Sequence, residues 1–82
     1  MPGRRHALIL PELGLTNATI TASAWLSEVG TRVYEGDRLL EISAGEVIVD
    51  LPAPATGVLV EQLVGEDDEL HIGQTLGMIE EA

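Results

Sequence analysis

Residues 39–57 read LLEISAGEVIVDLPAPATG, and this stretch predicts two β-strands joined by a short loop. Apolar residues occupy alternate positions in both arms: Leu40, Ile42, Val47, Val49 and Leu51. Alternation with a period of two is typical of half-buried strands. Residues 43–46 form the connection, and Gly45 within it can adopt the positive φ that a tight turn between twisted strands requires. The stretch therefore predicts an antiparallel hairpin.

The tail of the same stretch, residues 51–57, ends the second arm of the hairpin. Pro52 and Pro54 have no backbone N–H to donate, and their rings favour an extended exit from the strand. Gly57 follows them, and we expect it to let the chain turn again. The tail thus predicts a defined end to the hairpin.

The rest of the chain reads as further short strands separated by turn residues. Strands are expected at residues 6–10, 18–26, within 29–37, and at 58–64, 70–73 and 75–79. Asn17 is expected in a turn, and the core is expected to include Leu26, Val49, Val58, Val60 and Leu63. No segment carries apolar residues at a spacing of 3.6, so we expect no helix.

An internal repeat supports this architecture. Six pairs of identical or similar residues are 37 positions apart: Thr19 and Thr56, Leu26 and Leu63, Val33 and Leu70, Gly36 and Gly73, Leu39 and Leu76, and Ile42 and Ile79. Neither half alone would cover its apolar face, so the halves should pack sheet on sheet. The expected fold is all-β, a flattened antiparallel β-barrel or sandwich of two four-stranded sheets with pseudo-twofold symmetry. The hairpin loop is expected at one end, with both termini near the other.

Length and composition limit the possible functions. The 82 residues suit one domain, 1–82, and 45% apolar content in alternating patterns argues against disorder. The net charge of −10 would repel nucleic acid and anionic lipid, and the absence of cysteine excludes a disulfide framework or a thiol nucleophile. The apolar run near the N-terminus is interrupted at Pro11 and Glu12, so it does not predict a secretory signal. With no stretch of transmembrane length, we expect a cytoplasmic, soluble protein.

The segments described so far resemble the biotinyl/lipoyl carrier domains, and in particular the lipoyl domains of 2-oxo acid dehydrogenase acyltransferases. The resemblance covers residues 10–16, the V-G-x-x-V-x-x-G-D element at 29–37, the P-A-P-x-x-G segment at 52–57 and the closing L-x-I-G-Q-x-L at 70–76. It implies the same barrel fold. It also implies that position 46, at the tip of the hairpin, corresponds to the lysine that carries the prosthetic group in this family.

Position 46 is a glutamate, and the chain contains no lysine. An amide link to lipoate or biotin requires an amine, which the Glu46 carboxylate does not supply. The flanking positions depart from the family as well: Gly45 stands where lipoyl domains carry aspartate, Ser43 where they carry glutamate, and Val47 where biotin domains carry methionine. One change alone would suit an engineered mutant, whereas several together suggest natural loss. We therefore expect no bound cofactor.

Other residues with chemical potential give weaker signals. His6 and His71 are the two histidines, and we expect them at strand ends rather than in a metal site. Ser43 has no predicted base beside it, since His71 belongs to a distant strand, so no catalytic residue is expected. Residues 66–69, EDDE, lack the spacing of a calcium loop and predict a solvated turn. Trp25 is expected to pack at the rim of a sheet.

Two classes of function remain open. The first is a degenerate lipoyl-like domain that acts as a protein-interaction or scaffold module. Its protein partner is unknown, and components of a dehydrogenase complex are among the candidates. The second is a lipoyl-carrier-type domain of an acyltransferase from such a complex. A stand-alone enzyme ranks third, because a small barrel has no room for a substrate pocket and no nucleophile, base and oxyanion donors are evident.

Overall fold

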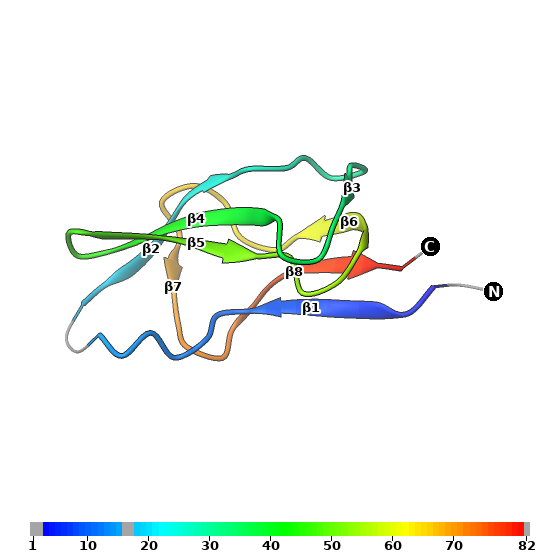
Figure 1. Cartoon of the computed structure of the whole chain (residues 1–82). Helices are drawn as coiled ribbons and strands as arrows, with labels where there is room; N and C mark the ends of the chain where they lie inside the picture. Colours follow the sequence, from blue (N-terminus) through cyan, green and yellow to red (C-terminus); the bar gives the residue numbers. More distant parts are fainter. Residues whose placement is uncertain (1–2, 16–17, 82) are drawn as a thin grey trace.

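The computed structural model describes residues 3–15 and 18–81, and its regular elements are all β-strands. The strands are β1 (Arg5–Ile9), β2 (Ile20–Trp25), β3 (Arg32–Val33), β4 (Arg38–Ala44), β5 (Val47–Pro52), β6 (Gly57–Gln62), β7 (Glu69–Leu70) and β8 (Thr75–Glu80). They form two four-stranded antiparallel sheets, ordered β1-β8-β6-β3 and β5-β4-β2-β7. This confirms the all-β prediction and the number of sheets (Figure 1).

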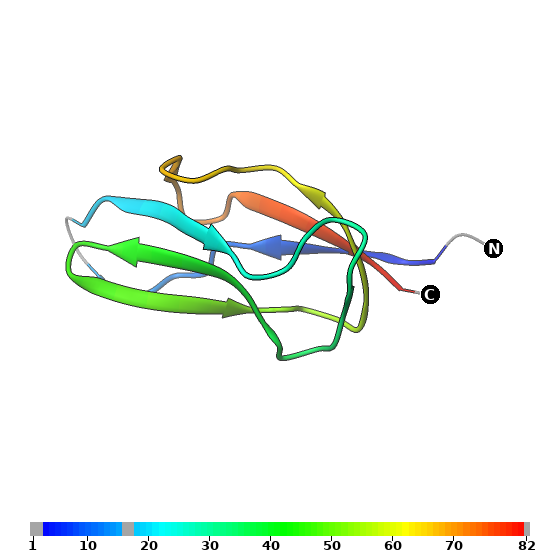
Figure 2. The same ribbon diagram turned by 90° about the horizontal axis from the view of Figure 1, so that it is seen from above.

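The two sheets enclose one apolar core, which both halves of the chain supply. Its fully buried large side chains are Leu10, Val33, Leu39, Leu40, Ile42, Leu59, Leu76 and Ile79. Two views of the ribbon place the chain ends at one end of the molecule and the β4–β5 turn at the opposite end, as the sequence predicted (Figure 1, Figure 2). The core therefore separates the hairpin turn from the ends of the chain.

The predicted pseudo-twofold symmetry is visible in equivalent hydrogen bonds. Leu26 N–H donates to Leu39 O at 2.8 Å, and Leu63 N–H donates to Leu76 O at 2.9 Å, with every residue shifted by 37 positions. The same shift relates β2, β3 and β4 to β6, β7 and β8. It also relates the β-bulges, which lie at residues 22–24 in β2 and at 59–61 in β6. The internal repeat in the sequence thus corresponds to a repeat of the backbone.

The connections that follow β1 and β5 differ in length. Ten residues, 10–19, join β1 to β2, whereas four residues, 53–56, join β5 to β6. Residues 16 and 17, and with them the predicted turn at Asn17, lie outside the described part of the chain. The symmetry of the strands is therefore broken by six additional residues in the first connection.

Two predicted core leucines are exposed, and the β-bulges explain why. Leu26 is 46% exposed and Leu63 is 51% exposed. Each follows the bulge of its strand, where an inserted residue interrupts the alternation between inward and outward side chains. The prediction for these two leucines was wrong, whereas Val49 does pack against the core.

The inward face of β6 was also assigned incorrectly. Leu59 is fully buried, while Val58 and Val60, which the sequence placed inside, are only partly buried. Three successive apolar residues contain no alternation from which a face can be chosen, and pairing of Leu59 with Ile79 of β8 decides it. Strand β7 is also shorter than predicted, since it ends at Leu70 instead of extending to residue 73.

Gly57 was expected to let the chain turn, but in the structure it allows two strands to approach closely. It begins β6, and a Cβ atom at this position would lie 2.2 Å from the backbone oxygen of Glu80. Gly77 has a similar role, since its Cβ would lie 2.9 Å from Cη2 of Trp25. The Trp25 indole N–H donates to Val64 O at 2.8 Å and its ring packs against the core, as expected of a rim residue. These glycines allow close packing between neighbouring strands.

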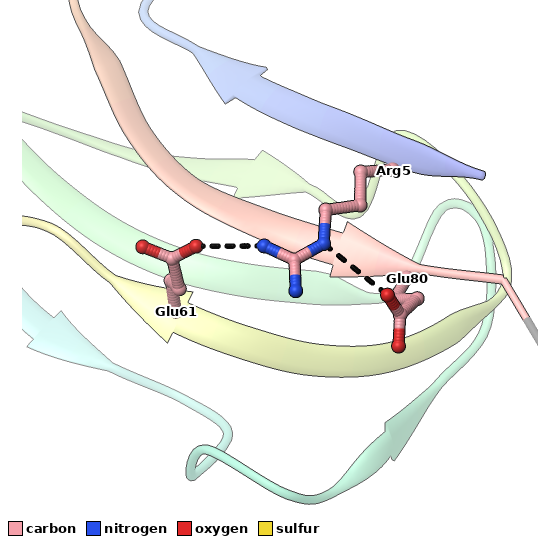
Figure 3. A network of polar contacts seen from close by, with 3 residues as sticks. All are labelled: Arg5, Glu61 and Glu80. Carbon is pink, nitrogen blue, oxygen red and sulfur yellow. Dashed lines mark hydrogen bonds and ion pairs between the residues drawn. The ribbon is translucent and has the colours of Figure 1, made fainter. Parts of the chain in front are cut away.

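An exposed polar network crosses the sheet at the end that holds the chain ends. The Arg5 guanidinium of β1 reaches Glu61 of β6 at 3.0 Å and Glu80 of β8 at 3.2 Å (Figure 3). Exposed ion pairs of this kind each contribute at most about 1 kcal/mol. In the same region His6 pairs with Glu81. In the described residues there is no helix that is long and apolar enough to cross a membrane.

Candidate functional site

The β4–β5 turn is the candidate site, because the sequence resemblance assigns the prosthetic group to this position. Ala44 pairs with Val47, so the turn itself consists of Gly45 and Glu46, and Ser43 belongs to β4. The loop is therefore shorter than the four residues predicted. Both turn residues are exposed.

Backbone geometry at the turn matches the predicted role of glycine. Gly45 has a φ of 64°, and Glu46 has no positive φ. A two-residue loop with positive φ at its first position only is the pattern of a type II′ turn, whose twist matches that of the flanking strands. A Cβ atom at Gly45 would meet no neighbouring atom within 4 Å. The cost of another residue at this position is therefore conformational and not steric.

Apolar side chains flank Glu46 on the second arm. Val47 is 44% exposed and Ile48 is 59% exposed. Val47 points to the same face as buried Ala44 but lies past the end of the core, whereas Ile48 pairs with Ser43 on the outer face. The alternation of Val47, Val49 and Leu51 already places Ile48 on the outer face. The sequence therefore contained a signal for an exposed isoleucine beside the tip, although Ile48 was not among the predicted site residues.

Ser43 takes part in a small group of hydroxyls and has no base beside it. Its Oγ lies 3.1 Å from Ser23 Oγ and 3.5 Å from Thr21 Oγ1, both on the neighbouring strand β2. These contacts satisfy the hydroxyl without activating it. His71 follows β7, which β2 separates from β4 in the same sheet, and its Nε2 lies 3.8 Å from Glu69 Oε2. The structure does not bring Ser43 and His71 together as a nucleophile and base.

The two histidines lie at different ends of the molecule. His6 is in β1 and pairs with Glu81, which lowers the pKa of that carboxyl below its ordinary value because the histidine hydrogen-bonds it. His71 directly follows Leu70, which pairs with Ile20 in the half of the sheet that carries the β4–β5 turn. Across the described residues no group of three metal-ligating side chains is present.

Residues 65–68 form the turn that precedes β7, and Glu69 is the first residue of that strand. Asp68 Oδ2 accepts a hydrogen bond from Gly65 N–H at 2.7 Å and so closes the turn, while Asp67 has a φ of 68°. All four acidic side chains of residues 66–69 are exposed to solvent. The geometry fits the solvated turn that the sequence predicted.

The chemistry available at the tip follows from Glu46. Among the described residues no cationic side chain pairs with its carboxylate. The tip therefore presents an exposed carboxylate on a two-residue turn flanked by apolar side chains, and it supplies no amine for an amide bond.

Comparison with known proteins agrees with this fold. The biotin/lipoyl family model, described as a biotin-requiring enzyme, matches residues 6–79. The chain belongs to the biotinyl/lipoyl domain family. The match spans all eight strands apart from the first residue of β1 and the last of β8.

Relatives of this biotinyl/lipoyl domain include much longer proteins. One is the dihydrolipoyllysine-residue acetyltransferase component of the pyruvate dehydrogenase complex of Corynebacterium glutamicum, with 37% identity over 89% of this chain and 11% of the relative. The dihydrolipoyllysine-residue succinyltransferase component of the 2-oxoglutarate dehydrogenase complex of Bacillus subtilis is 36% identical over 88% of this chain and 17% of its own length. A third, the acetyltransferase component of the acetoin cleaving system of Pseudomonas putida, is 30% identical over 93% of this chain. The chain thus spans between about a tenth and a fifth of these relatives.

Proposed function

We propose that this chain is a lipoyl-like domain without a prosthetic group, which acts as a protein-interaction or scaffold module. One observation carries the proposal: the hairpin keeps a tight, exposed turn, yet position 46 is a glutamate and the chain contains no lysine. An amine is the group that an acylated carrier requires. In this proposal the domain keeps the shape of the family and has lost its covalent chemistry.

The partner in this proposal is a protein, and components of a 2-oxo acid dehydrogenase complex are the first candidates. Relatives are named as components of such complexes. The net charge of −10 disfavours nucleic acid and anionic membranes and favours a protein surface of positive charge. Exposed Val47 and Ile48 supply the apolar contact area beside the charged tip. The domain itself would catalyse no reaction.

A carrier-type domain of an acyltransferase component is the second candidate. It is favoured by 36–37% identity to two such components over 88–89% of this chain. Under this alternative the covalent role would be met by a different part of a larger protein or assembly. Both candidates therefore leave this chain unmodified, and they differ in whether another part of a larger protein or assembly carries the prosthetic group.

Intact-mass measurement tests the proposal directly. The chain is co-expressed with a lipoate ligase and a biotin ligase, with both cofactors supplied, and is then purified under native conditions. The proposal predicts the unmodified mass in both cases. A lipoyl or biotinyl adduct on the folded chain would contradict the proposal.

Binding to purified components tests the interaction role. Components of a pyruvate and a 2-oxoglutarate dehydrogenase complex are titrated with the chain, and Ile48→Ser is compared with Leu63→Ser, a matched change at another exposed apolar residue. The proposal predicts weaker binding for Ile48→Ser alone. Equal effects of the two changes would show that the tip is not the contact surface.

A further inference from the structure

The unequal connections between the strands create a cavity on one side of the molecule. Described residues of the longer connection, within 12–15 and 18–19, line a space of about 250 Å³ together with Ile20 and the segment 69–72. At the equivalent place in the other half, the short connection 53–56 places Ala53 and Ala55 in buried positions. The cavity is therefore a consequence of the six extra residues that break the pseudo-twofold symmetry.

The floor of the cavity is apolar. Ile20 and Leu70 are buried and pair with each other across β2 and β7. Half-buried Leu13 covers one side, and Ile72 lies on the other. The row of paired residues continues from Ile20 to Ala44, next to the β4–β5 turn, so the cavity lies in the half of the sheet that carries the tip.

Two carboxylates line the same space from opposite segments. Glu12 belongs to the longer connection, and its Oε1 accepts a hydrogen bond from Gly14 N–H at 3.0 Å, which holds the side chain in place. Glu69 belongs to β7, and its Oε2 lies 3.8 Å from Nε2 of His71. An apolar floor with two acidic groups is complementary to a guest that has an aliphatic stem and a cationic end.

We propose that this cavity accepts a lysine side chain presented by a partner protein. Its methylene stem would contact Ile20, Leu70 and Ile72, and its ammonium group would reach Glu12 and Glu69. A compact ammonium with three donors suits two carboxylates that come from separate segments, whereas a planar guanidinium suits one carboxylate held bidentately. Cavities that bind whole small molecules usually exceed about 300 Å³, so a single side chain is the better match in size.

This inference goes beyond the proposed function and does not depend on it. The cavity contains neither Gly45 nor Glu46, and the 82 residues contain no lysine, so the guest lies outside this sequence. A model amine tests the cavity without any dehydrogenase component. Failure of one proposal is therefore distinguishable from failure of the other.

The test uses Nα-acetyl-lysine N-methylamide as the probe, followed by backbone and methyl NMR shifts of the intact chain. We expect saturable shifts centred on Ile20, Leu70 and Ile72. The norleucine analogue, which lacks the ammonium group, and the diaminobutyrate analogue, which has a shorter stem, should each bind more weakly. Equal binding of the norleucine analogue, or shifts without saturation, would overturn the proposal.

Matched variants separate the cavity from the overall charge of the protein. Glu12→Gln and Glu69→Gln should each weaken binding of the lysine probe by about two- to fivefold, as expected for partly exposed ion pairs. Glutamine at position 12 still offers an oxygen to Gly14 N–H, so the connection should keep its shape. Glu35→Gln removes the same charge outside the cavity and should leave binding unchanged. An equal loss in Glu35→Gln would show unspecific attraction and would also overturn the proposal.

Discussion

Asp67 has a φ of 68°, a left-handed conformation that side chains rarely adopt, and its equivalent in the first half of the chain is Gly30, with a φ of 94°. Replacing Asp67 with glycine relieves backbone strain of about 1 kcal/mol, although glycine loses more entropy on folding. We expect Asp67→Gly to raise the free energy of unfolding by about 0.5 kcal/mol in urea titrations. Glu66→Gly is the control, since Glu66 lies in the same turn without a positive φ, and it should lower the free energy of unfolding. A higher free energy of unfolding in Glu66→Gly together with a lower one in Asp67→Gly would contradict this explanation.

The pKa of Glu81 is held below its ordinary value of 4.5, mainly because His6 hydrogen-bonds its carboxylate. A carboxyl with a lower pKa in the folded state stabilises that state above the unfolded pKa. The contribution is lost as the pH falls through the folded value. We expect His6→Ala to raise the pKa of Glu81 in a carbon-13 NMR titration and to reduce the acid-dependent loss of stability. An unchanged pKa in His6→Ala would show that the pair does not form.

Gly57 controls how closely strands β6 and β8 approach each other. Gly57→Ala would place a Cβ atom 2.2 Å from the backbone oxygen of Glu80, and a backbone atom cannot move aside as a flexible side chain can. We expect a loss of about 3 kcal/mol in the free energy of unfolding. Gly65→Ala is the control, since its Cβ would have only an ordinary contact of 3.9 Å with Asp68. Similar stabilities of the two variants would mean that β6 and β8 can separate at little cost.

The elements differ in how far the sequence determined them. Alternation in β4 and β5 predicted the hairpin, and the 37-residue repeat predicted two matching sheets, because both signals can be read from residue types and their spacing in the sequence. The inward face of β6 and the exposure of Leu26 and Leu63 were not predictable in this way, since they depend on a β-bulge and on pairing with β8. Of the candidate site, the turn and Gly45 were predicted, whereas the cavity arises from a difference in connection length whose effect on packing the strand pattern does not show.

The charge of the whole molecule should destabilise it at low ionic strength. With a net charge of −10 the folded chain repels itself, and salt screens that repulsion more than it weakens the few exposed ion pairs. We expect the midpoint of thermal unfolding to rise by several degrees between low salt and about 0.5 M sodium chloride, which corresponds to roughly 1 kcal/mol for a domain of this size. A mild decrease in pH toward about 5 should act in the same direction. A midpoint that does not respond to salt would show that the carboxylates are already compensated.

The central claim concerns the molecule as a whole: we propose that the fold presents position 46 as a carrier domain would, and that the attachment amine and its usual flanking residues are missing. Installing the amine tests it most directly. Gly45→Asp with Glu46→Lys installs the aspartate and the lysine that lipoyl domains carry at this turn. The positive φ at position 45 costs an aspartate about 1 kcal/mol, which a folded domain tolerates.

The decisive measurement is the intact mass of three proteins after co-expression with a lipoate ligase: the parent chain, the Gly45→Asp/Glu46→Lys variant, and Glu66→Lys as a lysine placed in another exposed turn. We predict a single lipoyl adduct on the double variant and none on the parent or on Glu66→Lys. A double variant that is folded by circular dichroism and remains unmodified would contradict the claim, because the turn would then present position 46 in a way that the ligase does not accept.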